Sequence, residues 1–135
     1  MRAEVLQPAG WPRPKGYANG VVARGRQIFL AGQIGWDEHG RFPSVDLPGQ
    51  VRQALRNIVT LLAEAGAGPE HIVRLTWFIT SRDEYHAELP GIGAAYREVL
   101  GRNFPPMSVV QVVALVESLA KVEIEATAVI PDGTD

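Results

Sequence analysis

The chain has 135 residues, of which 46% are hydrophobic and 21% are charged, and its formal net charge at pH 7 is −2. This length and composition are typical of one globular domain, here residues 1–135, with a core of its own. The charge gives no sign of a nucleic-acid-binding surface, no apolar run approaches the roughly 18 residues of a membrane span, and the absence of cysteine excludes disulfides and cysteine nucleophiles.

The first half of the chain is expected to hold two short strands and a helix. Residues 1–19 are rich in proline and predict an irregular lead-in, followed by strands over 20–23 and 27–31. Residues 24–26, with the sequence Arg-Gly-Arg, predict a hairpin turn between these strands. A loop rich in glycine and polar residues follows.

The helix in this half has clear start and stop signals. Asp46 is suited to cap its N-terminus, and Pro48 falls in the first turn, where the missing N–H costs nothing. Gly66 is the expected stop. Between these points one apolar stripe recurs at helical spacing and is formed by Val51, Leu55, Ile58, Val59 and Leu62.

The second half predicts a strand over 72–80, a helix over 89–100, and strands over 108–115 and 121–130. The resulting order, β-β-α-β-α-β-β, predicts an α+β domain with a mixed sheet and both helices on one face. Because the strands supply apolar residues to both faces, the face without helices is expected to associate with further copies of the chain. A closed ring of identical subunits would bury that face.

The last strand carries two acids on one face. Side chains alternate between the faces of a strand, so Glu123 and Glu125 share one face with Thr127, while Val122 and Ile124 share the other. Such a strand can pack a core and still present a carboxylate to a cleft. The alternative is a solvated carboxylate or one that pairs with a basic residue at a subunit contact.

Five segments, taken in order, resemble the RidA/YjgF family of enamine and imine deaminases, which is also labelled endoribonuclease L-PSP. Each segment is similar to one family motif: residues 16–20 (GYANG) to G-P-Y-x-x-G, 29–34 (FLAGQI) to a strand ending S-G-Q-I, 72–78 (IVRLTWF) to I-V-K-x-T-V-F, 104–108 (FPPMS) to F-P-A-R-S, and 122–126 (VEIEA) to (V/I)-E-I-E-A. No single motif is specific, but the ordered set spans nearly the whole chain.

The resemblance implies a chorismate-mutase-like α+β fold and a homotrimer with three ligand clefts between subunits. It implies hydrolysis of short-lived enamines and imines, made by pyridoxal-phosphate enzymes, to a 2-keto acid and ammonia, with no cofactor and no metal. In the family an arginine in F-P-A-R-S grips the substrate carboxylate, and the first glutamate of E-I-E-A directs a water molecule. Carried onto this chain, the resemblance gives Glu123 as the catalytic residue and Tyr17, Ala31, Gly32, Met107 and Val109 as the substrate-binding residues.

This chain departs from the family where the substrate is gripped. Met107 stands at the position of the family arginine, and a thioether cannot make the charge-assisted, bidentate contact of a guanidinium. Arg74 and Arg102 are the candidates for a replacement carboxylate clamp, although a solvated or ion-paired surface arginine is the default interpretation of each. Met107 itself can line an apolar pocket or fill the core.

For each of the other candidate site residues, a purely structural role is an alternative to a role in binding. Tyr17 can cover a ligand or pack at a subunit seam. Gly32 can let a ligand approach the backbone or simply end a strand. Glu125 is expected to be structural. The three histidines show no metal-ligand spacing, so no metal site is expected.

Three functions remain open from the sequence, so whether the chain is an enzyme is also open. The first is a hydrolase of imines or enamines that lack a clamped 2-carboxylate, with Glu123 directing water. The second is a trimer that binds a small metabolite or a partner protein without catalysis. The third and weakest is a ribonuclease, because the chain lacks a basic footprint. The N-terminal residues show no apolar signal-peptide core, so we expect a cytoplasmic protein.

Overall fold

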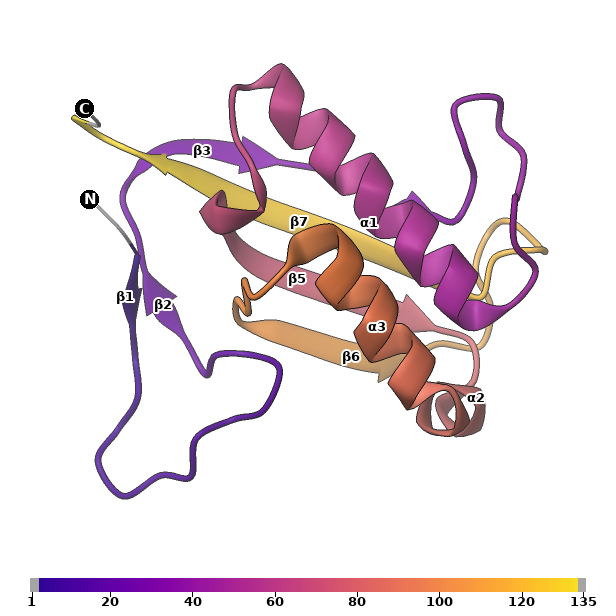
Figure 1. Ribbon diagram of the computed structural model, residues 1–135, viewed down its shortest axis with the longest axis horizontal. Coiled ribbons are helices and arrows are strands. Elements are labelled where there is room, and N and C mark those ends of the chain that lie inside the picture. Colours follow the sequence, from indigo (N-terminus) through magenta and orange to yellow (C-terminus); the bar gives the residue numbers. More distant parts are fainter. Residues whose placement is uncertain (1–2, 134–135) are drawn as a thin grey trace.

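The computed structural model describes residues 3–133, so the first two residues of the predicted lead-in lie outside it. Its main sheet has the strand order β3-β7-β5-β6, and β4 also pairs with β7 (Figure 1). Strands β5 and β6 run parallel, and the other pairs are antiparallel. The predicted α+β class with a mixed sheet is confirmed. The strands are β3 (Gly25–Phe29), β4 (Gln33–Ile34), β5 (Ile72–Ile79), β6 (Met107–Gln111) and β7 (Val122–Pro131).

Two long helices, α1 (Leu47–Glu64) and α3 (Leu89–Leu100), lie side by side over one face of this sheet (Figure 1). Helix α1 begins as predicted, because the Asp46 side chain accepts a hydrogen bond from the Gly49 N–H at 3.3 Å. A short helix, α2 (Arg82–Ala87), precedes α3, and a 3₁₀ turn (Pro69–His71) precedes β5. Helix α2 was not predicted, because residues 81–88, between the strand expected over 72–80 and the helix expected over 89–100, were read as a loop, and that interpretation was wrong.

The core lies between the two long helices and the sheet. Alternate residues of β5 and β7 point toward the helices and meet the apolar stripe of α1, as period two requires. They are Leu75, Trp77 and Ile79 on β5, and Val122, Ile124, Ala126 and Ala128 on β7. The other face of the sheet, which we call the open face, carries Phe29, Phe78, Glu123, Glu125 and Val110. Phe29 is 71% exposed there, which matches the expectation of apolar residues on both faces.

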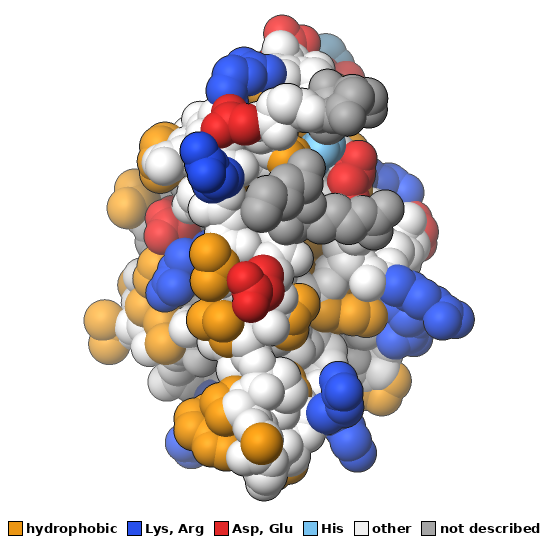
Figure 2. Space-filling model, turned by 90° about the vertical axis from the view of Figure 1, so that its left-hand side faces the viewer, with side chains coloured by type: hydrophobic (Ala, Val, Ile, Leu, Met, Phe, Trp, Pro, Cys, Tyr) orange, Lys and Arg blue, Asp and Glu red, His pale blue; other side chains and the backbone are white. Residues whose placement is uncertain are grey.

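The predicted hairpin at residues 24–26 is not formed. Strand β2 (Val21–Val22) pairs instead with β1 (Glu4–Val5), and the pair extends away from the main sheet (Figure 1). Gly25 begins β3, where it lies opposite Pro131 with a φ of 146°, and a Cβ there would lie 1.9 Å from the Ile130 carbonyl oxygen. Residue 25 therefore has to be glycine for β3 to pair with β7, and not because a turn needs it. Figure 2 shows this end of the molecule, where hydrophobic side chains stand on the surface beside basic ones.

Strand β6 is shorter than predicted, since it ends at Gln111 rather than at residue 115. The loop that follows is held by the buried side chain of Gln50 on α1. The Gln50 Nε2 donates to the carbonyl of Leu119 at 3.0 Å, and its Oε1 accepts from the Lys121 N–H at 2.8 Å. A third contact, from Nε2 to the Ser44 carbonyl at 3.3 Å, ties the loop before α1 to the same amide. Gln50 thus fixes the start of β7, the strand that carries Glu123.

Candidate functional site

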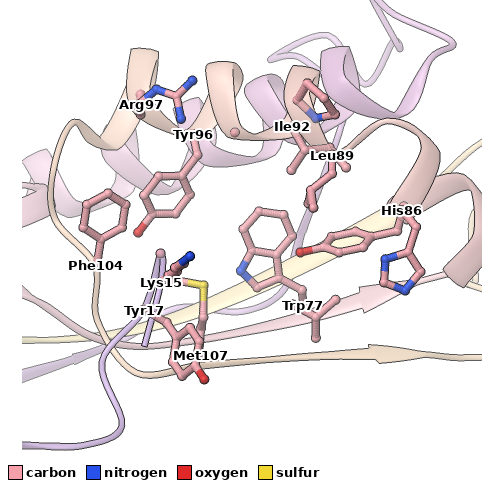
Figure 3. A pocket seen from close by; sticks show the side chains of 15 residues that line it. Lys15, Tyr17, Trp77, His86, Leu89, Ile92, Tyr96, Arg97, Phe104 and Met107 are labelled. Carbon is pink, nitrogen blue, oxygen red and sulfur yellow. The ribbon is translucent and has the colours of Figure 1, made fainter. Parts of the chain in front are cut away.

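A pocket of about 720 Å³ opens between helix α3 and the β5–β6 side of the sheet (Figure 3). The N-terminal segment around Tyr17 closes one side of it, and α2 closes another. Aromatic and aliphatic side chains form most of its wall. The aromatic ones are Tyr17, Trp77, Tyr85, Tyr96 and Phe104, and the aliphatic ones are Leu89, Pro90, Ile92, Met107 and Val109.

Three of these rings form a continuous stack. The Tyr96 ring lies 6.4 Å from the Trp77 ring at 16° and 5.6 Å from the Phe104 ring at 7°. The Tyr96 hydroxyl donates to the Asn103 carbonyl, and burial raises the pKa of Tyr96 far above its ordinary value. Tyr96 therefore stays neutral, and its single O–H is already engaged. It serves the pocket as a rigid apolar wall and not as an acid or base.

Trp77 carries a buried hydrogen-bond donor beside the pocket. Its side chain is 2% exposed, and its indole Nε1 has no hydrogen-bond partner within residues 3–133. In Figure 3 this nitrogen faces the side of the pocket where Met107 lies. Leaving a buried donor unsatisfied costs about 1–3 kcal/mol, so Trp77 is a position where the fold gives up stability.

Basic side chains, and no acidic ones, line this pocket. They are Lys15, His86 and Arg97, and neither Lys15 nor Arg97 makes a salt bridge within the described part of the chain. The candidates chosen from the sequence for a cationic clamp, Arg74 and Arg102, do not line it. Arg74 lines a separate hollow of about 410 Å³ beside β3 and β7, and Arg102 is exposed in the turn after α3.

Glu123 lies on the open face of the sheet. In the strand register it is opposite Phe78 of β5 and Ile34 of β4, so two apolar side chains flank it. Its carboxylate lies against Gly32, where a Cβ would be 2.2 Å from Glu123 Oε2. Among residues 3–133 no basic group lies within salt-bridge distance of Glu123. The carboxylate is thus held by close packing and keeps its oxygens free to bind water.

The predicted site residues fall into two groups on opposite faces of the sheet. Met107 lies opposite Leu75 in the register and points with it toward the helices, and Tyr17 and Val109 line the same pocket. Glu123 and Gly32 meet on the open face, and Ala31 is exposed next to Gly32. Within one chain, therefore, the predicted site residues do not come together in one place.

The sequence reading missed several pocket residues. Trp77 and Tyr96 lie in the strand and helix expected over 72–80 and 89–100 but were given no role in a site, and Lys15, Tyr85 and Arg97 were not singled out either. One signal was available for Tyr85, because Ser81 and Glu84 have the spacing of a helix start and the Ser81 hydroxyl accepts from the Glu84 N–H at 3.0 Å. Nothing in the sequence links residues 15–17 to α3.

Residues 3–133 contain no group of three or more His, Asp or Glu side chains placed to hold a metal ion. None of the helices in the described range combines the length and hydrophobicity that crossing a membrane requires.

Known proteins resemble this chain in both sequence and fold. The family model described as endoribonuclease L-PSP matches residues 12–130. A human protein named 2-iminobutanoate/2-iminopropanoate deaminase is 29% identical over 126 residues, which cover 93% of this chain and 88% of that protein. A Rid-family protein of unknown function from Yersinia pestis, YyfB, has a TM-score of 0.82 at 30% identity and is covered over its full length by 96% of this chain. TdcF of E. coli, in a structure with bound serine, has a TM-score of 0.67 at 30% identity, with 94% of this chain and 98% of TdcF covered. The chain therefore belongs to the endoribonuclease L-PSP family, which is the RidA/YjgF family that its motifs resemble.

Proposed function

We propose that this protein hydrolyses an imine or enamine to a carbonyl compound and ammonia, and that Glu123 directs the water. The observation that carries this proposal is the position of Glu123. Its carboxylate is packed against Gly32, is flanked by Phe78 and Ile34, and has no basic partner in the described residues. The name of the human relative, a deaminase of two imino acids, supports the same reaction class.

The chemistry needs one group that can both take and return a proton. The Glu123 carboxylate accepts a proton from water while the water oxygen bonds to the imine carbon and the C=N electron pair moves to nitrogen. The proton held by Glu123 then passes to that nitrogen, which gives the neutral carbinolamine. Glu123 next takes the carbinolamine O–H proton as the C=O bond forms and the C–N bond breaks, and it delivers this proton to the departing nitrogen, which leaves as ammonia. An enamine first becomes the imine by taking a proton at carbon and losing one from nitrogen.

A complete site requires a second copy of the chain, since the pocket and Glu123 lie on opposite faces of the sheet. We propose a ring of three copies in which each open face meets the pocket side of its neighbour, so that Glu123 of one copy faces the pocket of the next. The exposed apolar side chains on the open face, Phe29 and Val110, support such a contact. Each seam would then hold a water-directing acid opposite an apolar, aromatic wall.

The test of this function is ammonia release from imines generated in situ by an oxidase from a panel of amino acids and amines. Wild-type protein should accelerate release from at least one imine, and Glu123→Gln should lower the rate by about 10²–10⁴-fold. Glu125→Gln is the matched control, because Glu125 lies two residues away on the same face, and it should keep the rate. Release no faster than in buffer, or equal loss in both variants, would refute the assignment.

A binding protein without catalysis is the second candidate. Met107 in the pocket supports it, because a thioether cannot hold a 2-imino acid as a guanidinium can. TdcF, whose structure holds serine, is an example of a relative with a bound small molecule. In this case Glu123→Gln changes the affinity for a metabolite and no ammonia is released. The ribonuclease label of the family model is the weakest candidate, because the chain has a net charge of −2. RNA cleavage that separates from the protein during purification would exclude it.

A further inference from the structure

Helix α3 turns its acidic and its basic side chain to different sides. Glu98 faces α1, where its carboxylate oxygens accept hydrogen bonds from Arg52 at 3.1 Å and from Arg56 at 2.7 Å. Arg97 instead lines the pocket, and no acidic residue lies three or four positions away from it on the helix. The positive charge of Arg97 is therefore left for a ligand.

The Arg97 guanidinium lies along the pocket wall. Long side chains on a helix lean back toward its N-terminus, and a Cβ at Gly93, one turn earlier, would lie 3.3 Å from Arg97 Nη1. Gly93 also lines the pocket. Because residue 93 has no side chain, a ligand in the pocket can approach the guanidinium there.

Lys15 brings a second positive charge to the pocket from the N-terminal segment. Residues 5–36 contain no acid, and Lys15 makes no salt bridge in the part of the chain that the structure describes. Figure 3 shows Lys15 and Arg97 toward the end of the pocket where Phe104 stands, whereas His86 lies toward the other end. Two cations thus share one end of a pocket whose described lining has no acid.

The accessible part of the wall can hold the rest of such a ligand. Tyr17, Leu89 and Phe104 line the pocket and are 42%, 45% and 38% exposed, so their apolar surfaces are open to contact. An aromatic ring can stack on Tyr17 or Phe104 in an offset or edge-to-face arrangement. Since Arg97 and Lys15 are themselves exposed, an anionic group beside them keeps part of its water, and its desolvation costs little.

We propose that Arg97 and Lys15 bind the anionic group of a ligand with an aromatic or branched apolar body and, building on the hydrolase proposed above, that this contact determines its substrate class. A guanidinium is well shaped to bind a carboxylate. Arg97 stands on the helix wall of the pocket and Met107 on the strand wall, so an anion at Arg97 lies across the pocket from residue 107. The substrates are then imines and enamines whose apolar body separates the anionic group from the imine carbon, and not simple 2-imino acids.

Three probes with similar bodies and different charges test this site: 3-phenylpropanoate, 3-phenylpropanamide and 3-phenylpropylamine. Their affinities are measured by isothermal titration calorimetry at low ionic strength. We expect the acid to bind about five- to tenfold more tightly than the amide, as two solvent-exposed ion pairs predict, and the amine to bind most weakly. Salt at about 0.5 M should remove most of the advantage of the acid and leave the affinity for the amide unchanged.

Substitutions of the two cations assign the effect. Arg97→Gln and Lys15→Gln should each reduce the advantage of the acid over the amide by about two- to threefold, and the double variant should abolish it. Arg102→Gln and Arg13→Gln are the matched controls and should keep the advantage, because both arginines are exposed and neither lines the pocket. Equal binding of the three probes, no binding of the acid, an advantage that survives in the double variant, or an equal loss in the controls would overturn the inference.

The same binding series in Glu123→Gln separates the anion site from the proposed reaction. Preference for the acid in a protein that releases no ammonia from any imine would refute the hydrolase and leave the anion site intact. In the wild type, at matched rates of imine formation, the imine made in situ from 4-(aminomethyl)benzoate should release ammonia about five- to tenfold faster than the imine made from benzylamine. Accelerated release at equal rates from both would refute the substrate class alone.

Discussion

Replacing Gly32 by alanine tests whether the close packing of Glu123 matters. A Cβ at residue 32 would lie 2.2 Å from Glu123 Oε2, 2.7 Å from Cδ and 2.8 Å from Cγ, and ordinary van der Waals contact begins at 3.4 Å. The carboxylate must therefore move by about 1 Å. A displacement of this size at a reacting group can lower a rate by about 10²-fold, so we expect ammonia release by Gly32→Ala to fall by that factor.

The fold should tolerate this change. Gly32 does not have a positive φ, so alanine adds no backbone strain, and the half-buried Glu123 side chain can turn toward solvent. The free energy of unfolding in urea should change by less than about 1 kcal/mol.

A double-mutant cycle then identifies the cause of the lost rate. If alanine acts only by moving the carboxylate, Gly32→Ala should have no further effect on the rate in a Glu123→Gln background. A Gly32→Ala protein that is folded and fully active would refute the reasoning, because the Glu123 carboxylate would not need its present position.

Three further predictions concern the scaffold around the site. Gln50→Leu leaves the Lys121 N–H and a loop carbonyl without partners, so it should lower the free energy of unfolding in urea by about 2–3 kcal/mol. Tyr96→Phe should cost about 1 kcal/mol at pH 7, because the Asn103 carbonyl loses its donor. Because burial raises the pKa of Tyr96, the protonated phenol stabilises the fold in full below the ordinary tyrosine pKa of about 10, and this stabilisation is lost as the pH rises from there toward the raised pKa. The free energy of unfolding of the wild type should therefore fall more steeply above about pH 10 than that of Tyr96→Phe. Phe29→Glu should convert the assembled protein to a monomer in light scattering without changing its circular dichroism, since Phe29 is 71% exposed on the open face.

Each of these predictions has a control. Gln53→Leu removes a single side-chain hydrogen bond to Asn57 and should lower the free energy of unfolding by less than about 1 kcal/mol. If Gln50→Leu lowers it by no more than that, the Gln50 side chain does not hold the loop before β7 in place. Tyr85→Phe measures the share of the alkaline loss that belongs to the other tyrosine whose pKa burial raises. Leu61→Glu changes an exposed side chain on α1 and should leave the assembly intact, and a Phe29→Glu protein of unchanged mass would argue against the open face as the contact.

The elements that local patterns encode could be predicted. Helix α1 shows its stripe, its Asp46 cap and its early proline in the sequence, and β5, β7 and α3 match their predicted ranges within one residue. The pairing of β1 with β2 could not be predicted, because β2 has its partner at residues 4–5 and not in the next strand. Helix α2 has six residues, which is too short to show an apolar period.

The acid and part of the pocket wall were accessible from the sequence, since Tyr17, Met107 and Val109 were chosen there and line the pocket, but the rest of the wall was not. Strand alternation placed Glu123 on the face away from the core, and the register confirms it. The pocket is assembled from segments around residues 15–17, 77, 85–97 and 104–109, and only the tertiary fold brings them together. The cations near the pocket are Lys15 and Arg97, whereas the sequence favoured Arg74 and Arg102, since nearness along the chain to Met107 says little about which side chains share its face.

The separation of the pocket and Glu123 onto opposite faces has a consequence for mixtures of damaged chains. In a ring built as proposed, a copy whose pocket is blocked still places its Glu123 at the pocket of one neighbour. A copy that lacks Glu123 still has a pocket that the glutamate of its other neighbour can reach. Two inactive proteins, mixed in equal amounts and reassembled, would regain activity in about a quarter of their seams. Genetic complementation within the ring would thus arise from subunits that are each inert when pure.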